Sequence, residues 1–207
     1  MAAPKFLIKQ FAKPSGWLSS LAARALNKTN ATQNRATVDA LPLTTTSRVL
    51  DIGFGGGVSL EPLLQRCANG LVAGSEVSPE MIQRAKKIWA KQVGDGKLDL
   101  REAGAEKLPW QDDSFDFVMT VNTMYFWPDV LTGLAEIKRV LAPGGKFVTS
   151  CVPRNMLASL GFGDMGYRTE EPEHYAELMK QAGFEGVEVI PSNDMKKSKL
   201  LVGRAPG

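Results

Sequence analysis

The sequence is poor in the residues on which metal centres and disulfide-bonded folds depend. Its 207 residues include 2 cysteines and 1 histidine. Cys67 and Cys151 form neither a metal-ligand spacing nor a disulfide framework. We therefore expect two buried thiols, no bound metal, and a reducing compartment such as the cytoplasm.

Long apolar runs and phosphate-binding loops are absent as well. No apolar segment approaches the ~20 residues that span a bilayer, so we expect no integral membrane segment. The pattern G-x-x-x-x-G-K-[ST], whose backbone cradles phosphates, does not occur. Hydrophobic residues make up 43% of the chain and charged residues 23%, which is ordinary for a globular protein. The length of 207 residues predicts one enzyme-sized domain rather than several.

Acidic residues are missing from the first 38 positions. That segment carries six basic residues, namely Lys5, Lys9, Lys13, Arg24, Lys28 and Arg35. Such a start is typical of a mitochondrial or plastid transit peptide. It is equally typical of mature helices that cover a cleft or make peripheral contact with anionic lipid. The basic residues are too dispersed for a nucleic-acid surface, so we expect no nucleic-acid partner.

Helical periodicity favours the second interpretation of this segment. Apolar residues recur at a 3.6-residue period after Pro14, which predicts one helix, and residues 34–41 predict a second, shorter one. We therefore expect an N-terminal helical arm over residues 1–42 and a catalytic domain over residues 43–207.

A glycine-rich turn after a short apolar strand is the most informative feature of the chain. Asp51 closes the strand, and Gly53, Gly55 and Gly57 follow before a helical pattern begins. Glycine lacks a Cβ atom and adopts positive φ, so such a turn brings backbone close to a ligand. About 25 residues after Asp51, Glu76 ends a second apolar run, and an acid there can accept from both hydroxyls of a ribose. The pair predicts a nucleoside-containing cofactor.

The turn favours S-adenosylmethionine over a dinucleotide. The dinucleotide fingerprint is G-x-G-x-x-G, and here Val58 or Leu60 stands where its third glycine belongs. Asp51 would repel a pyrophosphate, whereas it suits the ammonium and sulfonium charges of S-adenosylmethionine. An NAD(P)-dependent Rossmann oxidoreductase is the less favoured alternative.

Strand and helix patterns alternate along the rest of the chain. Strands are expected at residues 48–52, 71–76, 98–102, 115–121, 146–151, 187–190 and 200–203, and helices at 58–68, 79–93, 128–141 and 170–182. Alternation of this kind predicts a doubly wound α/β fold, with a mostly parallel, seven-stranded, Rossmann-like sheet and helices on both faces. Ligands bind outside the carboxyl ends of such strands, which places Asp51, Glu76, Ala105 and Asn122 at one edge.

Four segments together resemble a known family. Asp51–Gly57 resembles motif I of the class I S-adenosylmethionine-dependent methyltransferases. The segments Gly74–Met81, Ala105–Trp110 with Asp113–Asp116, and Arg139–Lys146 resemble the branch that includes the ubiquinone and menaquinone biosynthesis methyltransferases. The resemblance covers residues 47–151 well. It implies transfer of a methyl group to a small-molecule acceptor, with oxygen or carbon favoured; a non-catalytic relative that binds S-adenosylmethionine is the alternative.

The resemblance and the chemistry together assign the cofactor residues. The backbone at Gly53, Gly55 and Gly57 would approach the methionine and ribose, with Asp51 facing the ammonium and Glu76 the ribose. Val77 and Met81 would form the wall beside adenine, and Gly104, Ala105 and Glu106 its edge. Relatives often carry an aspartate where this chain has Gly104, so we expect adenine recognition here to rest on the Ala105 N–H.

The segment after the fourth expected strand is predicted to lie beside the transferred methyl group. Asn122 is assigned to the cofactor, and Tyr125, Phe126 and Trp127 either line an acceptor pocket or pack the next helix on the sheet. Tyr125 and the single histidine, His174, are the candidate catalytic residues. The glycine-rich segment 161–166 is expected to act as a lid.

Overall fold

The computed structural model describes residues 19–192 and 198–207. Their elements follow the chain in the order α2 (Ser19–Asp39), β1 (Arg48–Ile52), α3 (Leu60–Arg66), β2 (Leu71–Glu76), α4 (Pro79–Ile88), α5 (Ala90–Gly94), β3 (Leu98–Glu102), β4 (Phe115–Val121), η2 (Met124–Phe126), α6 (Val130–Val140), β5 (Leu141–Cys151), α7 (Arg154–Ser159), η3 (Gly163–Met165), α8 (Pro172–Gln181), β6 (Glu185–Pro191) and β7 (Lys199–Arg204). The labels η2 and η3 denote single turns of 3₁₀ helix. Among the described residues, no helix is long and apolar enough to span a bilayer.

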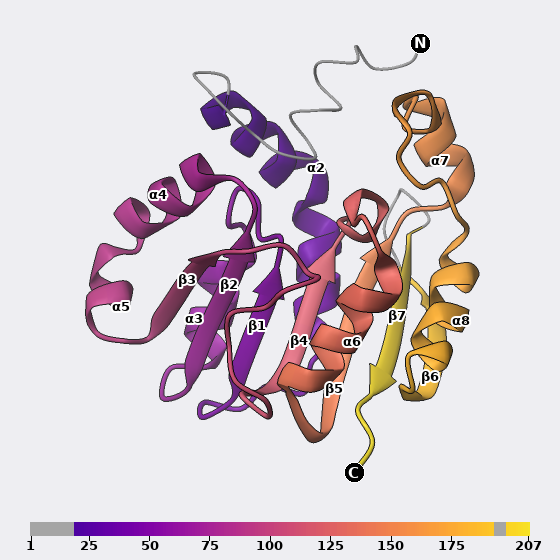
Figure 1. The fold of residues 1–207 in the computed structure, drawn as a ribbon. Coiled ribbons are helices and arrows are strands. Elements are labelled where there is room, and N and C mark those ends of the chain that lie inside the picture. The colour runs from indigo at the N-terminus through magenta and orange to yellow at the C-terminus, as the bar shows by residue number, and fades with distance from the viewer. Residues whose placement is uncertain (1–18, 193–197) are drawn as a thin grey trace.

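The strands form one sheet in the order β3-β2-β1-β4-β5-β7-β6 (Figure 1). Strands β1 to β5 pair in parallel, whereas β7 is antiparallel to both β5 and β6. The strand order reverses between β1 and β4, and this switch point is where open α/β sheets bind ligands. The predicted doubly wound, mostly parallel, seven-stranded sheet is therefore confirmed.

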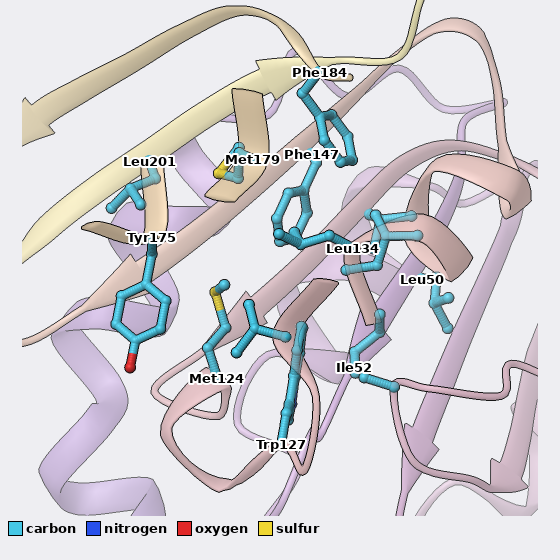
Figure 2. Close-up of a cluster of buried hydrophobic side chains, with 14 of the residues drawn as sticks. Leu50, Ile52, Met124, Trp127, Leu134, Phe147, Tyr175, Met179, Phe184 and Leu201 are labelled. Atoms are coloured by element: carbon cyan, nitrogen blue, oxygen red, sulfur yellow. The ribbon is translucent and has the colours of Figure 1, made fainter. Parts of the chain in front are cut away.

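Helices cover both faces of the sheet. In Figure 1, α6 and α8 lie on the near face, while α3 and the end of α2 lie behind it. Neighbouring strand residues point to opposite faces, so Leu50 belongs to the first apolar core and Val49 to the second. The first core contains Tyr175 of α8 (Figure 2), and the second contains Val38 of α2 and Leu63 of α3. Burial on both faces explains why the central strands are apolar almost throughout.

Two helix predictions were wrong in their number of segments. The two helices expected before residue 42 are one helix where the structure describes them, α2, because no proline or glycine interrupts residues 19–39. The part of the first predicted helix before residue 19 lies outside the described residues. The single helix expected over residues 79–93 is instead two, α4 and α5, which are separated at Trp89.

The break at Trp89 has a tertiary cause. A Cβ atom added to Gly57 would lie 2.8 Å from the Trp89 ring, so the indole packs directly on the backbone of the glycine turn. Trp89 has φ −109° and ψ 36°, outside the helical range. We infer that the packing of Trp89 on Gly57 interrupts the helical backbone between α4 and α5.

Candidate active site

A cavity of about 660 Å³ opens at the carboxyl ends of β1 to β4, the upper edge of the sheet in Figure 1. Its volume is within the usual range for small-molecule sites. Its lining brings together most of the residues predicted from separate segments: Asp51, Gly53, Gly55, Glu76, Val77, Gly104, Ala105, Glu106, Asn122 and Tyr125. The parallel topology thus collects at one edge the side chains that the sequence scatters over 75 positions.

The glycine turn forms part of the cavity lining. Gly53 has φ +71° and Gly55 has φ +53°, a region that side chains disfavour. The Gly53 N–H donates to the Ser75 carbonyl oxygen at 2.7 Å, which ties the turn to the end of β2. A Cβ atom on Gly53 would lie only 2.6 Å from Cγ2 of Thr123. The position therefore requires glycine for both conformation and space.

The Glu76 carboxylate is held by backbone donors on two sides. Its Oε2 accepts from the N–H of Gly55, and its Oε1 accepts from the N–H of Ser78, both at 3.0 Å. The residue is 5% exposed yet lines the cavity. These two hydrogen bonds fix the orientation of the Glu76 carboxylate and also hold the glycine turn against the end of β2.

Asp51 is a buried carboxyl with little to compensate its charge. It is 1% exposed, and the Ser59 hydroxyl donates to its Oδ2. Burial raises the pKa of Asp51 to about 7; the Ser59 hydrogen bond opposes this rise, and the nearby Glu76 charge adds to it. Such a group is stabilised in its charged form by a cation placed beside it. The environment therefore fits a ligand that carries an ammonium group.

Side chains of α6 hold the loop after β3 through hydrogen bonds to its backbone. The Leu108 N–H donates to Glu136 Oε2 at 2.9 Å, and the Arg139 guanidinium donates to the carbonyl oxygens of Leu108 and Trp110 at 3.0 and 2.9 Å. These bonds hold the segment from Ala103 to Glu106 at the cavity wall. Arg139 and Glu136 carry no cavity surface themselves, so their contribution is to positioning.

Asn122 and Tyr125 belong to a chain of hydrogen bonds in the cavity wall. Asn122, at φ +57°, donates from Nδ2 to Gln33 Oε1 at 2.9 Å and accepts at Oδ1 from the Tyr125 hydroxyl at 3.0 Å. The same hydroxyl accepts from the Val152 N–H at 2.7 Å. Burial raises the pKa of Tyr125 well above its ordinary value. The phenol is therefore a poor base at neutral pH, and its contacts favour a structural or positioning role.

The far half of the cavity is apolar and was largely missed by sequence reasoning. It is lined by Phe126, Trp127, Val152, Met156, Leu157, Leu160, Phe162 and Tyr167. The short helix α7 was not predicted; its signals are Pro153 at the start and apolar Met156, Leu157 and Leu160 at helical spacing. Trp127 was expected either to line the pocket or to pack in the core, and it does both. It lines the cavity, and it also belongs to the core with Ile52 and Met124 (Figure 2).

The segment expected to be a lid packs into this wall. Phe162 is 5% exposed, and its ring lies 6.2 Å from the Tyr125 ring and 5.5 Å from the Phe126 ring. The Arg168 N–H donates to the Tyr125 carbonyl oxygen at 3.3 Å. The segment thus contributes side chains to the cavity rather than only covering its mouth.

Three predicted site residues lie outside the cavity lining. Gly57 is buried against Trp89, and Met81 is a buried side chain of α4 at 1% exposure. His174 is exposed on α8, where its ring packs 6.2 Å from Tyr175. This placement does not support Met81 in the adenine wall or His174 in catalysis, and Gly57 contributes through its packing against Trp89. Conversely, Asn30 and Asn34 of α2 line the cavity without having been predicted.

The two cysteines are free and buried, as predicted. Burial raises the pKa of Cys67 to about 11 and that of Cys151 to about 12, so neither is a reactive thiolate at neutral pH. Within the described residues, no group of histidine, cysteine, aspartate and glutamate side chains is arranged to hold a metal ion.

Comparison with known proteins identifies the family. A methyltransferase domain model matches residues 50–149. The chain is 31% identical over 165 residues to a demethylmenaquinone methyltransferase of Deinococcus radiodurans, covering 66% of this chain and 67% of that protein. It is 29% identical over 164 residues to the uncharacterized methyltransferase YdaC of Bacillus subtilis, covering 77% of this chain and 83% of that protein.

Other relatives are longer or more distant. The chain spans 42% of the length of a rice chloroplastic 2-methyl-6-phytyl-1,4-hydroquinone methyltransferase, to which it is 29% identical over 143 residues, or 69% of this chain. The crystal structure of an S-adenosylmethionine-dependent methyltransferase from Aquifex aeolicus superposes with a TM-score of 0.71 at 19% identity, covering 90% of this chain and 98% of that one. The motifs, the fold and these matches agree: the chain belongs to the class I S-adenosylmethionine-dependent methyltransferases, in the branch that includes the ubiquinone and menaquinone biosynthesis enzymes.

Proposed function

We propose that this methyltransferase acts on a small, apolar, uncharged acceptor, at oxygen or carbon. The observation that carries the proposal is the division of one cavity into two unlike halves. The three acidic residues of the lining, Asp51, Glu76 and Glu106, all lie on the side of the glycine turn and the loop after β3, whereas the half formed by η2, α7 and Phe162 has no charged side chain. Of the described residues that line the cavity, none is lysine or arginine. An anionic acceptor would therefore lose its hydration without gaining a partner.

The residues on the acidic side fit S-adenosylmethionine, which supplies a methyl group on a reactive sulfonium when bound. We assign Asp51 to the ammonium, Glu76 to the ribose hydroxyls, and the backbone of Gly53 and Gly55 to the methionine and ribose. Asn122 would stand near the methyl group, between the two halves. The chain's own contribution is alignment of the two reactants and exclusion of water, which can supply several kcal/mol of the rate enhancement.

Among the residues described, none that lines the acceptor half is a strong general base. Tyr125 has a raised pKa and two hydrogen bonds, and His174 lies outside the cavity. An acceptor that must lose its proton before attack, such as a phenol methylated at oxygen, would have to give that proton to water, whereas an electron-rich ring methylated at carbon loses its proton afterwards. The relatives named for quinone substrates are consistent with this class.

The direct test is a screen of acceptors with detection of methylated product by mass spectrometry. Phenols and hydroquinones with increasing apolar substituents should be methylated, and carboxylated or phosphorylated analogues should not. A preference for the charged analogues would contradict the apolar acceptor. Cofactor binding with no turnover on any acceptor would indicate a non-catalytic relative, and binding of NAD(P) in its place would support the oxidoreductase alternative.

A substitution in the acceptor half tests whether that half binds the acceptor. Leu160 lines the cavity and is partly buried, so Leu160→Glu should raise KM for the best acceptor by about 10-fold or more, because a charge there is poorly solvated. Affinity for S-adenosylhomocysteine should stay within about twofold, since that ligand is assigned to the other half. Leu160→Met is the matched control and should leave both constants near wild type. Equal losses for acceptor and cofactor would contradict the division into halves.

We also propose that α2 belongs to the mature fold and forms one side of the cavity. Asn30 and Asn34 line the cavity, Gln33 bonds to Asn122, and Thr37 and Val38 are at most 1% exposed. These contacts support a cleft-covering helix over a transit peptide. They also cross the proposed boundary between residues 1–42 and 43–207, so we treat the two segments as one cooperative unit.

Deletion of residues 1–38 tests this role. The truncated protein should lose most of its affinity for S-adenosylhomocysteine, because Asn122 loses Gln33 as its partner and the cavity loses a wall. Isothermal titration calorimetry provides the constant, and circular dichroism shows whether the remainder is folded. Full affinity combined with altered localisation would instead make the segment an address signal or a membrane contact.

A further inference from the structure

The chain of hydrogen bonds that passes through Asn122 runs in one direction. A backbone N–H can only donate, and the Val152 N–H donates to the Tyr125 hydroxyl oxygen at 2.7 Å. That hydroxyl donates its own proton to Asn122 Oδ1 at 3.0 Å. Asn122 Nδ2 then donates to Gln33 Oε1 at 2.9 Å and to Asn30 Oδ1 at 3.3 Å. The Val152 N–H therefore fixes which way each amide in the chain faces.

The chain ends on α2 with two amide groups whose N–H donors are unused. Asn30 and Gln33 are engaged through their oxygens. In the part of the protein that the structure describes, neither Asn30 Nδ2 nor Gln33 Nε2 has a hydrogen-bond partner. Gln33 is only 1% exposed, and an unpaired buried donor costs free energy and is rare in native proteins. Donors left in this way indicate an acceptor atom on a ligand.

Both amides lie next to Asn122, which we assigned to the position beside the methyl group. Asn30 lines the cavity, and Gln33 lies between Asn30 and Asn34, which lines it as well. In Figure 1, α2 rises from behind the sheet to the edge where the cavity opens. The other end of the chain, at Val152, lines the acceptor half. The unused donors therefore stand where an acceptor must bring its reacting atom.

The described lining offers no cation to an oxygen that becomes negatively charged. It contains no lysine or arginine, and its acids, Asp51, Glu76 and Glu106, disfavour a further negative charge. Successive hydrogen bonds polarise one another, which strengthens the last donors of such a chain. Preorganised N–H donors stabilise an oxygen that gains negative charge during a reaction. The two amides of α2 are placed to do so here.

We propose that Asn30 and Gln33 donate hydrogen bonds to the ring oxygen of a phenol-type acceptor and stabilise its ionised form. The inference rests on the proposed function, because it needs that oxygen beside the methyl group. The O–H bond breaks, its electron pair stays on the oxygen, and the proton goes to water, so no side-chain base is required. The ionised acceptor is more nucleophilic at its oxygen and at the adjacent ring carbons, and the two amides therefore serve methylation at either atom.

The test uses 4-nitrophenol, a phenol that titrates near neutral pH and whose ionised form alone absorbs visible light. The probe is added at pH 7 to protein saturated with S-adenosylhomocysteine, so that the cofactor half is filled. Bound to wild type, it should be mostly ionised. Asn30→Asp and Gln33→Glu keep an oxygen that accepts from Asn122 but replace the N–H donors, and each should lower the ratio of ionised to neutral bound probe by about 10-fold or more. Thr32→Val, at an exposed position of the same helix, is the matched control and should leave the ratio unchanged.

A neutral variant and a neutral ligand separate hydrogen bonding from added charge. Asn30→Ala removes one donor without adding a charge and should lower the ratio by about 5-fold. The methyl ether 4-nitroanisole cannot ionise, so its Kd should stay within about threefold of wild type in every variant.

Two kinds of failure are distinguishable. An unchanged ratio in Asn30→Ala would overturn the inference, and an accompanying loss of about 10-fold in affinity for S-adenosylhomocysteine would assign the amides to the methionine carboxylate instead. Failure of both nitro compounds to bind the wild type would overturn the apolar acceptor site itself, and the inference with it.

Discussion

Replacing Glu76 with alanine is expected to abolish binding of S-adenosylhomocysteine. The side chain is assigned to both ribose hydroxyls, and hydrogen bonds to a charged acceptor contribute ~1.5–3 kcal/mol each. The substitution also leaves the N–H groups of Gly55 and Ser78 without the acceptors that now hold the turn. We therefore expect affinity to fall by about 100-fold or more.

Thermal unfolding provides a rapid measurement of this effect. Ligand at about 100 times its Kd should raise the Tm of the wild type by about 5–10 °C, and Glu76→Ala should show no shift at the same concentration. Glu76→Gln should behave similarly, because its amide NH₂ would face one of the two backbone donors. Glu61→Gln, on the exposed start of α3, is the control and should respond like wild type. A wild-type shift in Glu76→Ala would show that the ribose is bound elsewhere.

Asp51 should give cofactor binding and protein stability opposite dependences on pH. Burial raises the pKa of Asp51 in the ligand-free fold to about 7, from an ordinary value of 3.8. As pH falls from 7 to 4, the folded protein keeps a proton that the unfolded chain has lost, so this group's contribution to stability rises. The ammonium of the ligand needs the ionised form, so affinity should fall by up to about tenfold for each pH unit below 7.

Asp51→Asn separates the two effects. The variant should lose both slopes, because the amide does not titrate and the remaining facing groups, Ser59 and Glu76, stay in place. Its affinity at pH 8 should be about 10-fold or more below wild type, since the ion pair with the ammonium is lost. Calorimetric titration with S-adenosylhomocysteine from pH 5.5 to 8 measures the affinity, and melting without ligand measures the stability. A flat affinity profile for the wild type would contradict the assignment.

The cofactor half of the site was predictable because its signals are local. The first four strands have the bounds expected from their apolar runs, 48–52, 71–76, 98–102 and 115–121. Asp51 and Glu76 follow from strand ends, and parallel pairing then places them at one edge. The glycine turn is a constraint within a few residues, so a single sequence displays it.

Beyond Tyr125, Phe126 and Trp127, the acceptor half was not predictable, because its contacts are remote in sequence. Its wall joins η2, α7 and Phe162, and the polar chain from Gln33 through Asn122 and Tyr125 to Val152 links positions about 120 residues apart. Helix breaks had similar causes: Trp89 leaves helical geometry to pack on Gly57. Contacts between residues far apart in the sequence determine the acceptor wall and the helix break, and the periodicity of a single sequence does not reveal such contacts.

The place of β7 between β5 and β6 has a consequence for how the chain is made. In the sheet, β6 has β7 as its neighbour, yet β6 comes earlier in the sequence. During synthesis the strands β1 to β5 can pair as they emerge, whereas β6 leaves the ribosome before the strand that will bind it exists. Until β7 has been made, β6 stays unpaired, and exposed unpaired strands are prone to association with other chains. Five of the seven residues of β6, from Glu185 to Pro191, are exposed, which suits a strand that stays in water until β7 has been made.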